Sequence, residues 1–244
     1  MSIDAAIVVS SCDLFKAVWK PFCHGLHKYW PDCPWPMVFI TNEEEPPCGG
    51  NFQMGPDGGP HGWSAMSRDA LERINAPVVL WIHDDNWLCA PVNNNVVASL
   101  VALFEDDLAL HLIRLSNCYM STTCGGYSRD ERLRIICRDS RQRTSLQPSL
   151  WRRETMIELL VDGESPWTWE GMAPHRSRHI NGDFLCCREG FRPIRFLSHV
   201  DPDWTNEAVE RGKWTKSARN YCQREGIDVD FSVHPNRNPN EDWG

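Results

Sequence analysis

The sequence predicts an α/β protein in which helices flank a mostly parallel central sheet. Two observations support this fold class. Short apolar runs rich in β-branched residues, without apolar–polar alternation, are typical of strands buried on both faces of a parallel sheet. Stretches of helical periodicity separate these runs. An alternation of strand, helix and strand predicts parallel strands that are connected by crossover helices.

Four strands are predicted in the first half of the chain: residues 5–13 (AAIVVSSCD), 37–41 (MVFIT), 78–82 (VVLWI) and 108–116 (LALHLIRLS). Residues 14–26 carry an apolar residue at every fourth position and predict a helix that Pro21 kinks. Residues 63–76 and 92–104 predict the next two helices, and Pro77 ends the first of them.

The second half of the chain is less regular. Residues 152–162 (RRETMIELLVD) predict an amphipathic helix that Gly163 ends, and residues 182–190 (GDFLCCREG) predict a short hairpin arm. The end of the segment 207–226 predicts a further helix, and residues 235–244 predict a loose tail.

We expect one domain over residues 1–244. The length of 244 residues allows a single sizeable core, and neither an internal repeat nor a low-complexity linker divides it. Within this domain, residues 1–116 form a regular half of alternating predicted strands and helices, and residues 117–234 form a less regular half.

Composition narrows the possible partners and the compartment. A net charge of −8 disfavours a broad nucleic-acid-binding surface, which needs a stripe of Lys and Arg, although it does not exclude nucleic acid. No apolar run of about 18 residues predicts a membrane span, and no signal peptide is evident. We therefore expect a cytoplasmic protein whose 11 cysteines are free thiols; without a CxxC pair, no structural zinc site is predicted.

The motif that indicates a functional site most clearly is the pair of adjacent acids in VVLWIHDDNWL. Asp84 and Asp85 directly follow a buried strand, and Asp13 also ends one. Ligands of open α/β sheets bind at the carboxyl ends of the strands. Adjacent carboxylates repel each other unless water or a cation surrounds them, and Mg²⁺ or Mn²⁺ often takes one or two carboxylates together with substrate phosphates. The pair predicts a divalent-metal diphosphate site, with an exposed turn as the alternative.

The order of segments resembles the small nucleotide-sugar-dependent glycosyltransferases of the GT-A fold. The resemblance rests on IVVSSCD, WPDCPWPMVFIT, GWSAMSRDALERI, VVLWIHDDNWL, SLQPSLWRRETMIELL, SPWTWE and RGKW, which together span most of residues 5–214. It implies a Rossmann-like GT-A sheet and a Mn²⁺- or Mg²⁺-dependent enzyme. Such an enzyme moves a sugar from a nucleotide-sugar donor, UDP being the first guess, to a hydroxyl of a glycan or other acceptor, with inversion. The resemblance also implies that residues 1–116 form the nucleotide-sugar-binding half and residues 117–234 the acceptor-binding half.

The resemblance assigns the metal site to HDDNW, which lies where the family has its DxD-type motif. Asp85 would be the principal ligand, and Asp84 would face the ribose or the metal. Asn86 lies where the second acid of a regular D-x-D would fall, and its amide oxygen would also suit a hard ion. His199 would be a second ligand, with a surface histidine as the alternative.

The resemblance also assigns donor and acceptor contacts. Asp13 would bind the base or ribose, or it would cap the following helix instead. Trp63 would contact the donor or pack its helix, and the side chains of Gln147 and Trp151 would shape a sugar pocket or pack. Arg211 and Lys213 would close over the diphosphate or line a solvated helix face. The full predicted donor-binding set is Ser10, Asp13, Trp63, Ser64, Asp84, Gln147, Trp151, Trp169, Arg211 and Lys213.

The segment SPWTWEGM, residues 165–172, predicts an aromatic, acidic loop. The resemblance assigns the family's general base to this loop, as Glu170. Its carboxylate would take the proton of an acceptor hydroxyl, which then attacks the anomeric carbon opposite the diphosphate. Partial desolvation beside Trp167 and Trp169 would suit a base, because burial raises the pKa of a carboxyl group. The alternative is an acid of a solvated loop.

Three other functions compete with a transferase of this kind. A nucleotidyltransferase would also want acids and a divalent ion, but the segment SSCDLFKAVW lacks a glycine-rich phosphate loop. A non-catalytic nucleotide-sugar-binding module stays open because Asn86 replaces an acid. A glycoside hydrolase would need two carboxylates across a cleft, which the predicted parallel sheet does not favour. The Arg-rich stretch 129–143 predicts either a lid over the diphosphate or a solvated loop.

Overall fold

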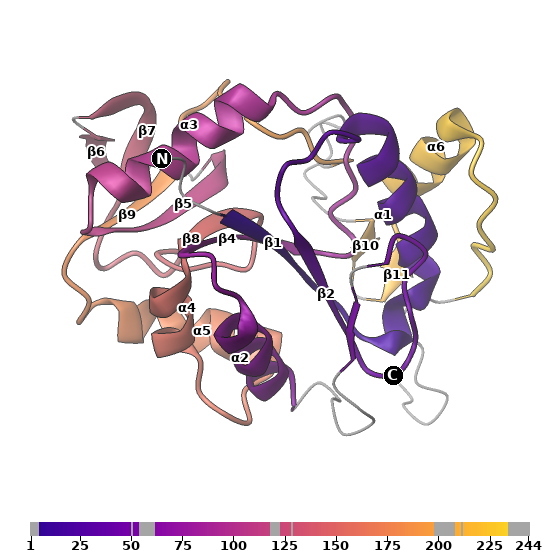
Figure 1. Cartoon of the computed structure of the whole chain (residues 1–244), viewed down its shortest axis with the longest axis horizontal. Coiled ribbons are helices and arrows are strands. Elements are labelled where there is room, and N and C mark those ends of the chain that lie inside the picture. Colours follow the sequence, from indigo (N-terminus) through magenta and orange to yellow (C-terminus); the bar gives the residue numbers. More distant parts are fainter. Residues whose placement is uncertain are drawn as a thin grey trace.

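A single large mixed sheet lies between two layers of helices (Figure 1). The computed structural model of the chain describes residues 5–49, 51–53, 62–117, 123–127, 129–197, 208–210 and 212–233. The α/β class with a mostly parallel central sheet flanked by helices is confirmed.

Nine strands form the sheet in the order β3-β2-β1-β4-β8-β5-β9-β7-β6. Their bounds are β1 Ala5–Ser10, β2 Met37–Thr41, β3 Asn51–Gln53, β4 Val78–His83, β5 Leu110–Asn117, β6 Thr123–Tyr127, β7 Asp130–Ile136, β8 Ser149–Arg152 and β9 Asp183–Cys187. Only β7 and β8 of these nine run against the others. A small ribbon of β10 (Val209–Glu210) and β11 (Lys213–Trp214) lies apart from the sheet.

The four strands predicted in the first half are present, and two predictions in the second half need correction. The segment 182–190 is not a hairpin arm, because β9 pairs in parallel with β5 and lies inside the sheet. SPWTWE is not a loop but the first turns of a helix. Ser165 caps that helix by accepting a hydrogen bond from the Thr168 N–H at 3.2 Å, and Pro166 occupies its first position.

The helices cover the sheet in two sets (Figure 1). We call the side of the sheet covered by α1 (Lys16–Tyr29), α3 (Asn94–Asp106) and α6 (Lys216–Glu225) the α1 face. The α2 face is covered by α2 (Trp63–Arg73), α4 (Arg153–Leu159) and α5 (Pro166–Ser177). A short 3₁₀ turn, η1 (Asp13–Phe15), leads into α1.

Both faces of the central strands are buried, which explains the unbroken apolar runs. In β4, Leu80 and Ile82 pack against the α1 face, whereas Val79 and Trp81 pack against the α2 face. Residue side chains alternate along a strand, so this parity also decides where the residues after β4 point.

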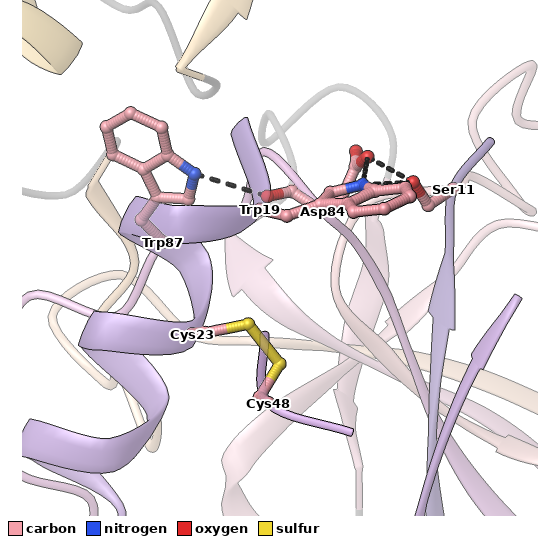
Figure 2. Close-up of a disulfide and its surroundings, with 6 residues drawn as sticks. All are labelled: Ser11, Trp19, Cys23, Cys48, Asp84 and Trp87. Carbon is pink, nitrogen blue, oxygen red and sulfur yellow. Dashed lines mark hydrogen bonds between the residues drawn. A yellow bond between two sulfur atoms is a disulfide. The ribbon is translucent and has the colours of Figure 1, made fainter. Parts of the chain in front are cut away.

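Two disulfides tie neighbouring elements together. Cys23 of α1 pairs with Cys48 of the loop after β2 (Figure 2), and Cys124 of β6 pairs with Cys137 after β7. The expectation of free thiols is therefore wrong for these four cysteines. No disulfide forms in the described part of the chain at six other cysteines: Cys12, Cys33, Cys89, Cys186, Cys187 and Cys222.

Within the described part of the chain, no helix is both long and apolar enough to cross a bilayer.

Candidate functional site

The predicted site residues gather at the C-terminal edge of the parallel strands. β1 ends at Ser10 and β4 at His83, and the register sets these two residues side by side. β8 runs in the opposite direction and pairs Ser149 with Trp81, so the segment that leads into β8 lies at the same edge. The edge therefore brings together the ends of β1 and β4, the start of β8 and the turns that connect them.

Asp84 is buried against the α1 face, with 5% of its surface exposed. Its Oδ2 accepts hydrogen bonds from the Ser11 hydroxyl and, at 3.1 Å, from Trp19 Nε1 (Figure 2). Trp19 Nε1 also lies 2.8 Å from Ser11 Oγ, so the three side chains form a closed triangle. Burial raises the pKa of Asp84 to about 7, against the lowering effect of these two donors. Asp84 thus faces the protein interior rather than the open edge.

Asn86 closes the tight turn that follows β4. Its Oδ1 accepts a hydrogen bond from the His83 N–H at 2.8 Å, and its own N–H donates to the His83 carbonyl at 3.0 Å. Asn86 is buried, as is Asp84, whereas Asp85 between them is partly exposed. The turn therefore leaves Asp85 as the acid of the trio that reaches the surface.

The hairpin that contains RGKW lies beside this turn. The Ala208 N–H donates to the Asp85 carbonyl at 3.1 Å, and the ring of Trp214 lies 6.1 Å from that of Trp87. Lys213 is exposed on β11. Arg211 and His199 lie outside the described residues, so their predicted roles stay predictions.

Asp13 is engaged by the loop that follows β2. Its Oδ1 accepts from the Asn42 N–H at 3.0 Å, and its Oδ2 accepts from the N–H groups of Glu43 and Glu44 at 2.9 and 3.0 Å. It does not cap the following helix, whose N-terminal turn is preceded by Cys12. Asp13 therefore stabilises the loop after β2 through hydrogen bonds to its backbone. Contact of Asp13 with a nucleotide base remains a prediction.

Ser10 and Trp63 meet on the α2 face. Trp63 Nε1 donates to Ser10 Oγ at 2.9 Å, and both residues are buried. The Ser64 hydroxyl is also buried and has no hydrogen-bond partner in the described part of the chain. The Trp63 ring packs edge-to-face on Trp81 and Trp169, with centroids 6.2 and 6.1 Å apart.

Trp151 and Trp169 belong to the core and do not line an open pocket. Both are fully buried, their rings lie 6.1 Å apart, and Trp169 Nε1 donates to the Leu159 carbonyl at 3.0 Å. The packing alternative therefore describes Trp151. Trp167, two residues before Trp169, is instead 67% exposed.

Glu170 is held at the same edge of the sheet from α5. Its Oε1 accepts from the Leu146 N–H at 2.7 Å and from the Ser145 hydroxyl at 3.2 Å. No hydrogen bond to Oε2 comes from the part of the chain that the structure describes. Glu170 is partly exposed, so one oxygen is fixed by the segment before β8 while the carboxylate still reaches solvent.

Three residues at this edge were missed by the sequence analysis. Ser11 and Trp19 hold Asp84, and Ser116 donates to Gln147 Oε1 at 2.6 Å. The alternation of side chains along β4 could have predicted the contacts of Asp84, because Asp84 lies two residues after Ile82 and so points to the same side, towards α1.

His83 points to the opposite side of the strand. Burial lowers the pKa of His83 to about 4, and its Nε2 has no hydrogen-bond partner among the described residues.

The Arg-rich stretch is only partly a solvated loop: residues 130–136 form β7, whereas Arg138 and Arg141 lie exposed in the turns that follow. Arg132 pairs with Asp130 on β7 at 2.5 Å. Arg143 is buried over the ring of Phe184 at 4.1 Å and donates to two backbone carbonyls. These arginines stabilise the far edge of the sheet.

A divalent ion fits this edge through few protein ligands. Among the described residues there is no group of three or more His, Cys, Asp and Glu side chains that could hold a metal. Asp85 is the partly exposed carboxylate of the trio, and Mg²⁺ commonly binds one or two carboxylates plus phosphates. Asn86 is a poor ligand because its amide oxygen already serves the turn.

No protein-family description and no curated protein matches the sequence. Among solved structures, S. aureus TarS 1-349 superposes with a TM-score of 0.49 at 11% identity, over 76% of this chain and 58% of that chain. The same protein in complex with UDP gives 0.47 at 10% identity, over 78% and 58%. CMP:2-keto-3-deoxy-manno-octonic acid synthetase complexed with CTP gives 0.44 at 10% identity, over 92% and 98%. The chain thus spans less than two thirds of the TarS chains, and likenesses this distant assign no activity.

Proposed function

We propose that the chain is a glycosyltransferase that uses a divalent metal and a nucleotide-sugar donor, with UDP the first nucleotide to test. The observation that supports this most is that two partly exposed carboxylates lie at the same edge of the sheet. Asp85 is partly exposed in the turn after β4, and Glu170 is oriented by the segment that enters β8 beside β4. Ligands of such sheets bind at this edge.

In this proposal Asp85 would hold Mn²⁺ or Mg²⁺, and the positive charge of the ion would offset the charge of the diphosphate leaving group. Asp84 does not reach the ion; through Ser11 and Trp19 it fixes the turn that presents Asp85. Lys213 comes from the hairpin bound to the Asp85 carbonyl, so it can approach the diphosphate. The proposal retains the predicted roles of Arg211 as a diphosphate contact and of His199 as a second metal ligand.

Glu170 acts as the general base. The Leu146 N–H and the Ser145 hydroxyl hold Oε1 and leave Oε2 for the proton of an acceptor hydroxyl. As that O–H bond breaks, the oxygen forms a bond to the anomeric carbon. The bond from this carbon to the diphosphate oxygen breaks on the opposite side, and its electron pair leaves with the diphosphate, which inverts the centre.

The test replaces Glu170 with Gln and measures donor binding and transfer separately. Donor binding with Mn²⁺ should persist, while transfer falls by roughly 10²–10⁴-fold, the usual contribution of a positioned base. Glu158→Gln on the exposed side of α4 is the matched control and should leave transfer unchanged. A donor panel read by thermal shift identifies the nucleotide first, because a bound ligand raises the melting temperature. Full transfer by Glu170→Gln would remove Glu170 from the mechanism.

A nucleotide-sugar-binding module without catalysis is the second candidate, since Asn86 serves the turn and leaves a single partly exposed acid in the trio. It predicts metal-dependent donor binding with no release of nucleoside diphosphate in any acceptor mixture. A nucleotidyltransferase would instead release pyrophosphate from a nucleoside triphosphate and a sugar phosphate, which the same set of assays detects.

A further inference from the structure

Trp167 is exposed on a part of the molecule that is otherwise tightly held. The tryptophans of the described residues are mostly buried in the core, whereas Trp167 is 67% exposed. It lies in the first turn of α5, three residues before Glu170. Residues three apart on a helix are neighbours on its surface, so Trp167 and Glu170, the proposed base, leave α5 on the same side.

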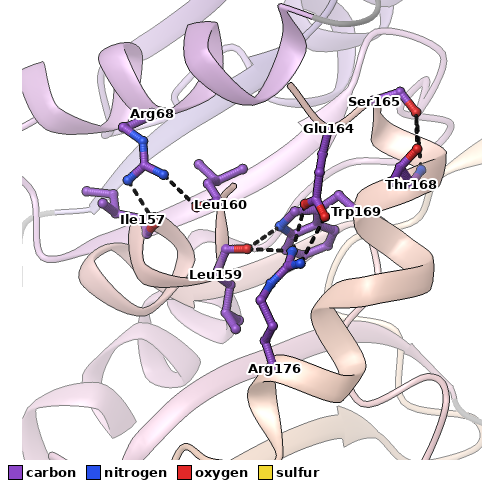
Figure 3. Close-up of polar contacts among 9 residues, drawn as sticks. All are labelled: Arg68, Ile157, Leu159, Leu160, Glu164, Ser165, Thr168, Trp169 and Arg176. Atoms are coloured by element: carbon purple, nitrogen blue, oxygen red, sulfur yellow. Dashed lines mark hydrogen bonds and ion pairs between the residues drawn. The ribbon is translucent and has the colours of Figure 1, made fainter. Parts of the chain in front are cut away.

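The start of α5 is rigid, so the exposure of Trp167 does not come from fraying. Ser165 caps the helix, and Trp169 Nε1 donates to the Leu159 carbonyl at 3.0 Å. Arg176 forms two bonds to the Glu164 carboxylate, at 2.9 and 2.7 Å, and a third to the Leu159 carbonyl at 2.8 Å (Figure 3). Hydrogen bonds from Trp169 and Arg176 therefore hold the connection between α4 and α5 in place.

Gly171 keeps the surface next to Trp167 empty. It lies four residues after Trp167, inside the helix, where glycine weakens a helix relative to alanine. Its backbone is not left-handed, and a Cβ placed on it would meet nothing within 4 Å. Neither backbone conformation nor packing among the described residues requires a glycine here, and the position leaves open surface one helical turn after Trp167.

We propose that Trp167 and Gly171 form a platform for a sugar ring of the acceptor, which makes the acceptor a carbohydrate. One face of a pyranose ring carries C–H groups and packs on the face of an indole, while the hydroxyls at its rim stay polar. A ring laid on Trp167 and over Gly171 has its rim next to Glu170, where one hydroxyl must lose its proton. This inference rests on the proposed function, which names Glu170 as the base.

The variants separate binding from folding. Trp167→Ala should lower kcat/KM for the acceptor about tenfold, the effect of one lost aromatic contact, and Trp167→Phe should restore part of it. Gly171→Leu fills the space beside the indole with a better helix former. It should lower acceptor kcat/KM similarly while the melting temperature stays equal or rises, and Gly171→Ala is the matched control. Donor affinity should stay at the wild-type value in all four variants.

The probes are methyl β-glucoside, methyl β-galactoside, N-acetylglucosamine and lactose as acceptors, beside a set of Ser- and Thr-containing peptides. Saturation-transfer NMR with the same sugars, without donor, detects the platform independently of catalysis. Binding of a sugar by the wild type, lost in Trp167→Ala and Gly171→Leu, supports the platform even where no transfer occurs, in which case only the proposed function fails. The platform is overturned if Trp167→Ala and Gly171→Leu both bind the sugars and transfer to them at wild-type levels. It is also overturned if the enzyme transfers to peptides alone.

Discussion

At the scale of single residues, the site depends on how the side chains of β4 and of the turn after it alternate between the two faces of the sheet. Asp84 continues the side of the strand that faces α1 and is buried there, whereas Asp85, the next residue, is partly exposed. The sequence predicted the acids and the sheet edge but not this division of roles. The partners that decide it, Ser11 and Trp19, come from other elements 73 and 65 residues away from Asp84.

Removing the hydroxyl of Ser11 tests this division. Ser11→Ala takes one donor from the buried Asp84 carboxyl and one acceptor from Trp19 Nε1. We expect the free energy of unfolding to fall by about 1–2 kcal/mol, the cost of leaving buried polar groups short of a partner. Urea unfolding measures it. Thr168→Ala, at an exposed hydroxyl of α5, is the control and should change stability by less than about 0.5 kcal/mol. Equal stability of the two variants would show that the triangle does not stabilise the turn.

At the scale of elements, the parallel strands were predictable and their neighbours were not. Unbroken apolar runs predicted four strands correctly, because both faces of these strands are covered: β1, β2, β4 and β5. β8 has four residues and β9 five, too few for a periodicity, and their places between β4, β5 and β7 depend on pairings far apart in the chain. The start of α5 was misread as a loop, although Ser165–Pro166 is a typical cap and first position of a helix.

The disulfide of α1 is the element-scale feature nearest the site. Cys23 lies one turn after Trp19, and Cys48 lies in the loop that Asp13 braces (Figure 2). Cys23→Ala/Cys48→Ala should lower the free energy of unfolding by about 3 kcal/mol, from the added chain entropy of the unfolded state. It should also weaken nucleotide-sugar binding, because α1 carries a donor to Asp84. Calorimetry on both variants measures the two effects.

The second disulfide supplies the control. Cys124→Ala/Cys137→Ala opens a loop of similar entropy at the β6–β7 edge of the sheet, away from the acid turn. It should cost a comparable free energy of unfolding and leave nucleotide-sugar affinity unchanged. If both double variants lose affinity equally, the link from α1 to the site is only global stability.

At the scale of the whole molecule, α6 returns from the end of the described chain to pack on α1. The side chain of Glu225 is 2% exposed and accepts hydrogen bonds from Lys28 at 2.6 Å and Tyr29 at 2.9 Å, with Arg224 and His24 close by. These donors lower the pKa of Glu225 to about 2, against the raising effect of burial, which is the largest single influence. No local pattern predicts this contact, because 197 residues separate Glu225 from Lys28.

This carboxylate makes stability depend on pH in a defined window. Because the pKa of Glu225 in the folded chain lies below its ordinary value of 4.5, the unfolded chain binds the proton more readily. The contribution is therefore complete above pH 4.5 and is lost as the pH falls towards 2. Glu225→Gln should lower stability at neutral pH and flatten the loss of stability across that window, as measured by urea unfolding at a series of pH values. Glu210→Gln, at the exposed residue of β10, should keep the wild-type slope. If Glu225→Gln keeps that slope too, another carboxylate controls the acid unfolding of the protein.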